Sequence, residues 1–128
     1  MRASSSLLRQ YSITGDPAVQ GRYRLGILLD PKSRGGSSAI HADFQVGQVI
    51  EIGYPRNNFP LRLNSGHSVL FAGGIGITPI LSMAYALASA GRSYELHYCG
   101  RSASRLAFID ELKRFGDNVH VHLDDGPD

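Results

Sequence analysis

The chain has 128 residues, 42% of them hydrophobic and 19% charged, with a formal net charge of +2, which suits a soluble globular protein. No block of lysine and arginine alternates with aromatic residues, which argues against a nucleic-acid partner. A single cysteine, Cys99, excludes an internal disulfide and a four-cysteine cluster within this chain. No apolar run approaches the roughly 20 residues that span a bilayer, and residues 1–6 lack a signal-peptide core, so the sequence predicts a cytoplasmic protein without a membrane segment.

The first half of the chain is typical of strands joined by glycine-rich turns. A polar loop over 33–38 precedes a predicted short helix over 39–44, with Ser37 or Ser38 as its N-cap. The segment 55–65 has no clear period, so we place a domain boundary at its end. Strand patterns bounded by turn residues occupy three segments: 7–14, 23–29 and 46–54.

The second half changes to the pattern of a parallel α/β fold. An apolar strand over 68–72, of the kind covered on both faces, runs into Gly73-Gly-Ile-Gly76. Thr78 and Pro79 suit the N-cap and first position of a helix, and Gly91 suits its end. A second helix is predicted over 106–115, and further strands over 94–99 and 119–123. This order is half of a doubly wound nucleotide fold.

The sequence therefore predicts a two-part α+β and α/β chain. A partial antiparallel β-barrel is expected in 1–65, and a partial doubly wound parallel sheet in 66–128. Each part has roughly 60 residues, which is marginal for an independent core, and three strands are too few to close a barrel. We therefore expect a fragment truncated at both ends, or a chain that needs a partner surface, with self-association through its open sheet edges.

The glycine turn at 73–76 is the most informative functional signal. A strand-to-helix turn without side chains lets a phosphate or ring approach backbone N–H groups at the positive end of a helix. This favours nucleotide binding over a tight turn without a ligand. The turn departs from the G-x-G-x-x-G fingerprint, and Arg101 and Ser102 stand where an acidic residue would bind the ribose.

Two weaker motifs lie in the first half. Alternation on a strand places Arg9 and Tyr11 on one face, where a guanidinium can bind phosphate and a ring can cover a planar group. Taken alone, this pattern favours an ordinary strand with a solvated arginine and a packed tyrosine. The loop Arg34-Gly-Gly-Ser-Ser38 can hold a terminal phosphate on its amides and hydroxyls, or be a flexible connection.

The remaining polar side chains favour structural interpretations. His120 and His122 share one strand face, but no third ligand stands at a telling spacing, so surface histidines are expected rather than a metal site. Cys99 is typical of a small buried hydrophobe. The neighbours Asp110 and Glu111 are expected on a solvated face.

Taken together and in this order, the motifs resemble the phthalate dioxygenase reductase and vanillate O-demethylase reductase family, within the ferredoxin reductase superfamily. The resemblance extends from Leu8 to Gly126. Five segments carry it: Arg9-Gln-Tyr-Ser12, Arg34-Gly-Gly-Ser37, Pro55-Arg-Asn-Asn-Phe-Pro-Leu61, Ala72-Gly-Gly-Ile-Gly-Ile-Thr-Pro79, and Tyr98-Cys-Gly-Arg101 with Ala107-Phe-Ile-Asp-Glu-Leu112.

This resemblance implies a flavin-dependent oxidoreductase that passes hydride from NADH to FMN and electrons to a ferredoxin domain or terminal oxygenase. It implies no catalytic side chain, no metal ligand and no iron–sulfur cluster in this chain. The implied cofactor-binding residues are Arg9, Gly36, Ser37 and Ser38 for the flavin phosphate, Tyr11 and Ser12 for its ring, Gly74, Ile75, Gly76 and Thr78 between the two rings, and also Leu28 and Arg101.

Two alternatives stay open at this point. Arg101, Ser102 and Arg105 leave room for a 2′-phosphate, so NADPH is possible in place of NADH. The family's earlier barrel strands, its Cys-Gly-Pro element and its ferredoxin domain are absent from this sequence. The alternative function is therefore a catalytically silent, truncated flavin- or nucleotide-binding module.

Overall fold

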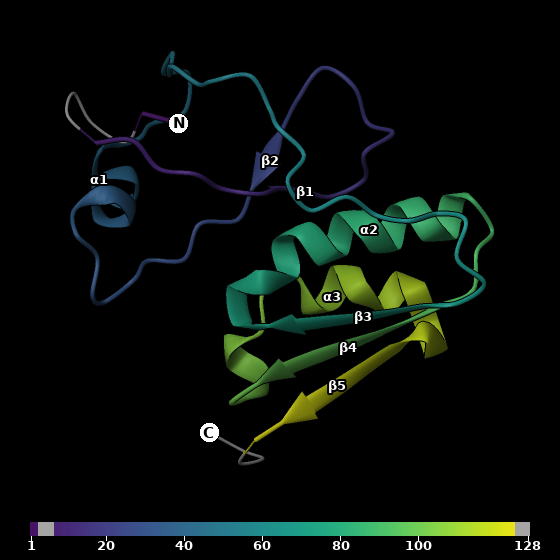
Figure 1. Cartoon of the computed structure of the whole chain (residues 1–128). Helices are drawn as coiled ribbons and strands as arrows, with labels where there is room; N and C mark the ends of the chain where they lie inside the picture. Colours follow the sequence, from purple (N-terminus) through teal and green to yellow (C-terminus); the bar gives the residue numbers. More distant parts are fainter. Residues whose placement is uncertain (3–6, 125–128) are drawn as a thin grey trace.

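The computed structural model describes residues 1–2 and 7–124, which form two parts of different character (Figure 1). The C-terminal part is a three-stranded parallel sheet in the order β3-β4-β5, with helices on one face. The N-terminal part has a short antiparallel pair, β1-β2, and one helix, and its described residues close no barrel. The coarse division into an antiparallel and a parallel part is thus confirmed, whereas a barrel is not formed.

The parallel sheet follows the predicted strands within one residue. β3 spans Ser68–Gly73, β4 spans Tyr94–Gly100 and β5 spans Val119–Leu123. Ser68 lies opposite Tyr94, and Leu96 opposite Val119, so all three strands end at the same edge of the sheet. This edge is where ligands bind in open α/β sheets.

Helix α2, Ile77–Ser89, covers one face of the sheet and carries much of the core. Ile77, Leu81 and Ala84 are completely buried, as expected for the apolar side of a helix on a sheet. The helix ends as predicted at Gly91, whose φ of +65° places it in the left-handed region. The Gly91 and Arg92 N–H groups donate to the Ala88 and Leu87 carbonyls, which is a Schellman motif.

The start of α2 differs from the prediction that Thr78 is its N-cap and Pro79 its first residue. A 3-10 turn, η1 (Gly74–Gly76), continues directly into the helix, so Gly76 is the N-cap. Thr78 lies inside the first turn, where its hydroxyl donates to the Ile75 carbonyl at 3.2 Å. Pro79 is still tolerated because the amides of the first turn have no intrahelical partner.

The prediction of one continuous helix over 106–115 is wrong. The chain instead forms η2 (Ala103–Arg105), a short α3 (Ile109–Leu112) and η3 (Lys113–Asn118). Phe108 caps α3 with a φ of +60°, and Gly116 interrupts η3 with a φ of +58°. Leu112 and Phe115 still face the core, so the apolar stripe was correct although the helix is broken.

The other face of the sheet is open in the described residues, which contradicts a β3 covered on both sides. Val69 is 45% exposed and Phe71 is 68% exposed, while Leu70 and Ala72 between them are buried. Cys99 also lies on the exposed side instead of being buried as predicted. These alternating exposures show that α2 and α3 cover only one face.

The N-terminal part is mostly extended backbone without strand partners. β1 comprises Ile13–Thr14 and β2 comprises Arg24–Leu25, much shorter than the predicted strands over 7–14 and 23–29. The predicted strand over 46–54 is absent, and Val46 and Val49 within it are almost fully exposed. Its apolar alternation has no facing strand among the described residues, and a strand cannot form without one.

Helix α1, Gly36–Asp43, begins earlier than the predicted 39–44. Neither Ser37 nor Ser38 caps it, because Gly35, with a φ of +108°, occupies the N-cap. Only a glycine adopts this conformation without strain. Because glycine has no side chain, the N-cap residue makes no side-chain hydrogen bond to the amides of the first turn.

Candidate functional site

The loop before α1 presents an anion-binding arrangement of backbone and side-chain donors. Helix α1 has no acidic residue in its first turn, so its positive end is not neutralised by its own sequence. Ser33 Oγ accepts from the Gly35 N–H at 3.1 Å, which shapes the loop. Ser37 Oγ accepts from the Asp30 N–H at 3.3 Å, so this hydroxyl lies at the start of the helix.

Arg9 lies directly against the start of this helix. A Cβ built on Gly36 would overlap Arg9 Cγ, Cδ and Nε, so the stem of the Arg9 side chain fills the space that a side chain at 36 would take. Arg9 NH1 donates to the Leu8 carbonyl at 2.7 Å, and the Arg9 backbone pairs with Met1 in both directions. The structure therefore places Arg9 against Gly36, next to Ser37 and Ser38 in the first turn of α1.

This donor set fits a phosphate group. It combines a guanidinium fork, hydroxyl groups and the N-terminus of an eight-residue helix. All of these groups prefer a negatively charged partner, and the glycine at 36 leaves room for the arginine beside the helix amides. The loop thus supports an anchor for the phosphate of a nucleotide.

The glycine turn is a second, separate surface at the carboxyl edge of the sheet. A Cβ at Gly73, Gly74 or Gly76 would meet no atom within 4 Å. The turn therefore offers bare backbone over open space, where a flat ring can approach closely. Ile75 is 37% exposed on the same turn, and Gly74 has a φ of +53° that favours glycine.

Tyr98 supports this turn from below and was not predicted as a site residue. Its side chain is completely buried, and its hydroxyl lies 3.2 Å from the Gly74 carbonyl and 3.1 Å from that of Ala107. Burial raises the pKa of the Tyr98 phenol. The only sequence signal for this role was its position in the motif Tyr98-Cys-Gly-Arg101.

The two halves of the chain meet next to the glycine turn. A Cβ on Gly26 would lie 2.9 Å from Thr78 Cγ2 and 3.1 Å from Phe108 Cε2. Ser82 Oγ of α2 also donates to the Ile13 carbonyl at 3.2 Å. Residues 13 and 26 of the first half thus touch the first turns of α2, beside the glycine turn.

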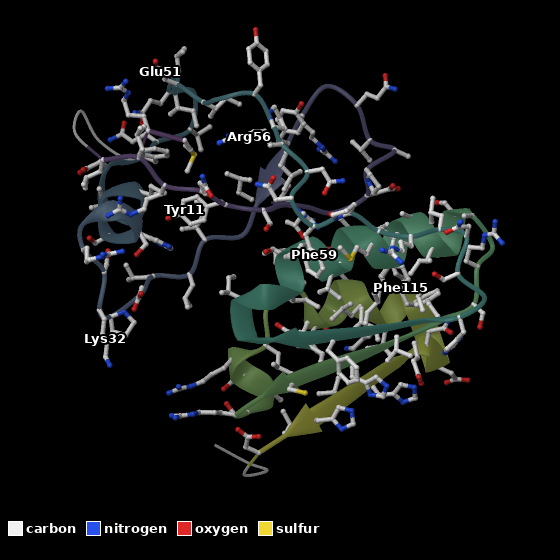
Figure 2. The ribbon with its side chains drawn as sticks, viewed as in Figure 1. Tyr11, Lys32, Glu51, Arg56, Phe59 and Phe115 are labelled. Carbon is white, nitrogen blue, oxygen red and sulfur yellow. The ribbon has the colours of Figure 1, made fainter. Side chains whose placement is uncertain are left out.

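The remaining predicted residues are spread over both halves of the chain. Tyr11 and Ser12 directly precede β1, and Figure 2 shows Tyr11 between α1 and the start of α2. Leu28 is 56% exposed between Gly26 and α1. Arg101 is exposed just beyond β4, at the same carboxyl edge as the glycine turn. The arrangement suits an elongated ligand with its phosphate at α1 and its ring near α2.

The histidines form a separate cluster on the open face of the sheet. The His97 ring stacks on His120 and His122 with centroids 5.0 and 5.2 Å away, and His97 Nδ1 lies 2.9 Å from His122 Nε2. Among residues 1–2 and 7–124, no group of three or more metal-ligating side chains has the geometry to hold a metal ion. Glu111, predicted as solvated, is instead hydrogen-bonded to Arg24 and Tyr85.

Comparison with known proteins relates the chain to oxygenase reductases. It is 52% identical over 124 residues to a vanillate O-demethylase oxidoreductase of Pseudomonas sp. strain HR199, covering 95% of this chain and 39% of that protein. A second vanillate O-demethylase oxidoreductase, from Pseudomonas putida, is 49% identical and also covered to 39%. The chain thus spans about two fifths of these curated relatives. No family model matches it.

A solved structure described as phthalate dioxygenase reductase, "a modular structure for electron transfer from pyridine nucleotides to [2Fe-2S]", has the same fold. It superposes with a TM-score of 0.85 at 40% identity, over 89% of this chain and 36% of that chain. Together with the sequence relatives, it confirms the resemblance that the motifs indicated. Within the described residues, no helix combines the length and apolar character needed to cross a bilayer.

Proposed function

We propose that this chain, which belongs by sequence to the phthalate dioxygenase reductase and vanillate O-demethylase reductase family, binds FMN and a nicotinamide nucleotide for electron transfer. In this proposal residues 1–65 are the flavin side and residues 66–128 the nucleotide side, although 3–6 and 125–128 lie outside the described residues. NADH is the proposed donor, with NADPH as the alternative. A ferredoxin domain or a terminal oxygenase is the proposed acceptor.

The observation that carries the proposal is the placement of the Arg9 side chain on the start of α1, in a half of the chain that contacts α2 next to the glycine turn. The Arg9 side chain fills the space over Gly36, and the first turn of α1 carries no acidic residue. Residues 13 and 26 connect this anchor to α2 through contacts with Ser82 and Thr78. A flavin mononucleotide requires a phosphate anchor together with a surface for its ring.

The chain's own residues would bind and orient the cofactors. Arg9 and the α1 amides would hold the flavin phosphate, Tyr11 would cover the ring, and Ser12 would donate a hydrogen bond near its reactive nitrogen. The turn Gly74–Gly76 and Thr78 would separate the flavin side from the nucleotide side. When bound, the nicotinamide supplies a hydride and the flavin accepts it, so no side chain need act as acid or base in that step.

The direct test is titration of the chain with FMN, and separately with FAD, followed by quenching of flavin fluorescence. Arg9→Ala should weaken FMN binding by roughly 10- to 100-fold, because a charge-assisted hydrogen bond contributes about 1.5–3 kcal/mol. Arg22→Ala is the matched control, since Arg22 is an exposed arginine outside the site. It should leave the affinity unchanged.

The same preparation tests the donor. With FMN bound, NADH and NADPH are each added without oxygen, and bleaching of flavin absorbance is followed. Bleaching that depends on both components supports the reductase. If the chain binds neither flavin, or if Arg9→Ala and Arg22→Ala weaken binding equally, the proposal is wrong.

A catalytically silent binding module is the second candidate, and one observation favours it. The described N-terminal residues close no barrel, and Val46, Val49 and Tyr54 are 95% or more exposed. Such a surface leaves the flavin side less rigid than the nucleotide side. Tight FMN binding without bleaching by either nucleotide would identify this module.

A further inference from the structure

We propose that Arg24 and Glu111 form an ionic clamp that positions the flavin side against the nucleotide side. This inference rests on the proposed function, because it assigns the pair a role in placing the two cofactor surfaces. Arg24 belongs to β2 and Glu111 to α3, so the pair joins segments 87 residues apart. Neither residue belongs to the cofactor-binding set that the sequence predicted.

One guanidinium nitrogen of Arg24 contacts both oxygens of the carboxylate. Arg24 Nη2 donates to Glu111 Oε1 and Oε2, each at 2.9 Å. The Arg24 guanidinium carbon also lies 5.0 Å from the centroid of the Phe108 ring, which is a cation–π distance. A Cβ at Gly15 would also come within 2.9 Å of the guanidinium group. Arg24 therefore contacts both halves of the chain, although its side chain is 45% exposed.

Tyr85 and Arg114, both in the second half of the chain, hold the Glu111 carboxylate in place independently of Arg24. The Tyr85 hydroxyl of α2 donates to Glu111 Oε1 at 2.5 Å, and Arg114 NH1 donates to that hydroxyl at 2.9 Å. The Arg114 guanidinium carbon lies 4.7 Å from the Tyr85 ring centroid. This network fixes the carboxylate on the nucleotide side, so that Arg24 binds a prepared partner.

The backbone around the pair is spaced for close approach. Gly26 shares the strand face of Arg24 and leaves no room for a Cβ against Thr78 and Phe108. Phe108 has a φ of +60°, a backbone conformation that costs an aromatic residue free energy. Such a conformation persists only where the surrounding contacts offset this cost. This conformation begins α3 and places both the Phe108 ring and Glu111 toward Arg24.

The consequence for function follows from Thr78. This residue is one of the proposed cofactor-site residues and is also the contact of Gly26, two residues after Arg24. If the clamp opens, the flavin side can move away from the start of α2 while each side keeps its own ligand contacts. Such a change alters the relative placement of the cofactors and not the binding of either one.

The first test measures this placement without any cofactor. In a Cys99→Ser background, spin labels are attached at Lys32→Cys and Asp117→Cys, both exposed and on opposite sides of the contact. The clamped chain should give one narrow distance distribution. Arg24→Ala should broaden or shift it, and Arg24→Ala with Glu111→Ala should do no more than Arg24→Ala alone. Glu111→Gln, which preserves shape, is the second variant in case an alanine variant unfolds.

The second test uses the chain loaded with FMN. Arg24→Ala should leave the FMN dissociation constant within about three-fold but slow flavin reduction by the nucleotide at least about ten-fold, since small misplacements of reacting groups cost large factors in rate. Lys113→Ala removes a charge from an exposed pair within the nucleotide side and is the control. It should change neither quantity.

The outcomes separate the clamp from the proposed function. An unchanged distance distribution in both Arg24→Ala and Glu111→Gln overturns the clamp, whatever the flavin does. A broadened distribution with an unchanged reduction rate overturns its positioning role. A chain that binds no FMN fails the proposed function only, because the distance measurement still decides whether the clamp holds the two sides together.

Discussion

The two halves of the chain differ in how much of their backbone is paired in strands and helices and in how many of their apolar side chains are buried. Between 66 and 124, three paired strands and α2 enclose a core in which Leu81, Leu96 and Tyr98 are completely buried. Between 7 and 65, two-residue strands and α1 leave most backbone unpaired, and Ile40 is the one buried large hydrophobic residue of that described range.

This difference shows that the two sides of the proposed site are held by different means. The nucleotide side is positioned by its own core, since burial of apolar surface offsets the entropy of ordering the chain. The flavin side has little core and is positioned by contacts such as Arg24 with Glu111 and Gly26 with Thr78. Its geometry therefore depends on the other half.

The largest effect should come from the core of the nucleotide side. Leu96→Ala removes a completely buried side chain from the central strand and should lower the free energy of unfolding by about 2–5 kcal/mol. Val49→Ala on the flavin side should change it by less than about 0.5 kcal/mol, because Val49 is 95% exposed. Urea unfolding of both variants checks this comparison. Equal losses would mean that the exposed segment carries a core of its own.

A smaller effect is expected where the halves meet. Gly26→Ala forces a Cβ against Thr78 and Phe108 and should cost about 1–3 kcal/mol, as overpacking does. Gly53→Ala is the control, since nothing lies within 4 Å of a Cβ there. Thermal unfolding compares the two variants. A Gly26→Ala protein as stable as the wild type would show that the halves are free to separate.

The ion pair between the halves should make a still smaller, pH-dependent contribution. Burial raises the pKa of the Glu111 carboxyl, but hydrogen bonds from Arg24 and Tyr85 outweigh this, and the pKa is lowered overall. A lowered pKa in the folded state contributes stability above the unfolded value, near 4.5, which is lost as the pH falls through the folded value.

Glu111→Gln should therefore lower the free energy of unfolding by about 1 kcal/mol at neutral pH, a small value because the partly exposed Arg24 is screened by solvent. In acid the penalty should be much smaller, because the Glu111 carboxylate of the wild type is then protonated as well. Unfolding at a series of pH values measures the difference. A penalty that does not shrink between neutral pH and pH 3 would contradict this account of the pair.

The smallest effect is expected at the surface of α3. Lys113 and Asp110 form an ion pair at 2.9 Å, but their side chains are 76% and 88% exposed. Lys113→Ala should therefore change the free energy of unfolding by less than about 0.5 kcal/mol at moderate salt. Urea unfolding in low and high salt checks this. If Lys113→Ala lowered the free energy of unfolding as much as Glu111→Gln does, the exposed fraction of a charged side chain would not predict how much its ion pair stabilises this protein.

Local sequence signals predicted the elements whose stability is local or strongly periodic. The strand over 119–123 follows from its apolar pattern, and the end of α2 at Gly91 follows from a backbone conformation that favours glycine. The prediction of a strand over 46–54 was wrong, because an alternating pattern indicates which side chains share a face but not whether a neighbouring strand is present to pair with. The prediction of a long helix over 106–115 failed because Phe108 has a φ of +60°, so that α3 begins only at Ile109, and local apolar spacing does not reveal such a break.

What the amino-acid sequence determined by itself was the resemblance to oxygenase reductases and the order of the parallel strands, since both depend on motifs and patterns of residues close together in the chain. The tertiary structure decided that Arg9 covers Gly36, that Tyr98 supports the glycine turn and that Arg24 binds Glu111. These contacts join residues that are distant in sequence, and only packing of the two halves determines which side chains meet.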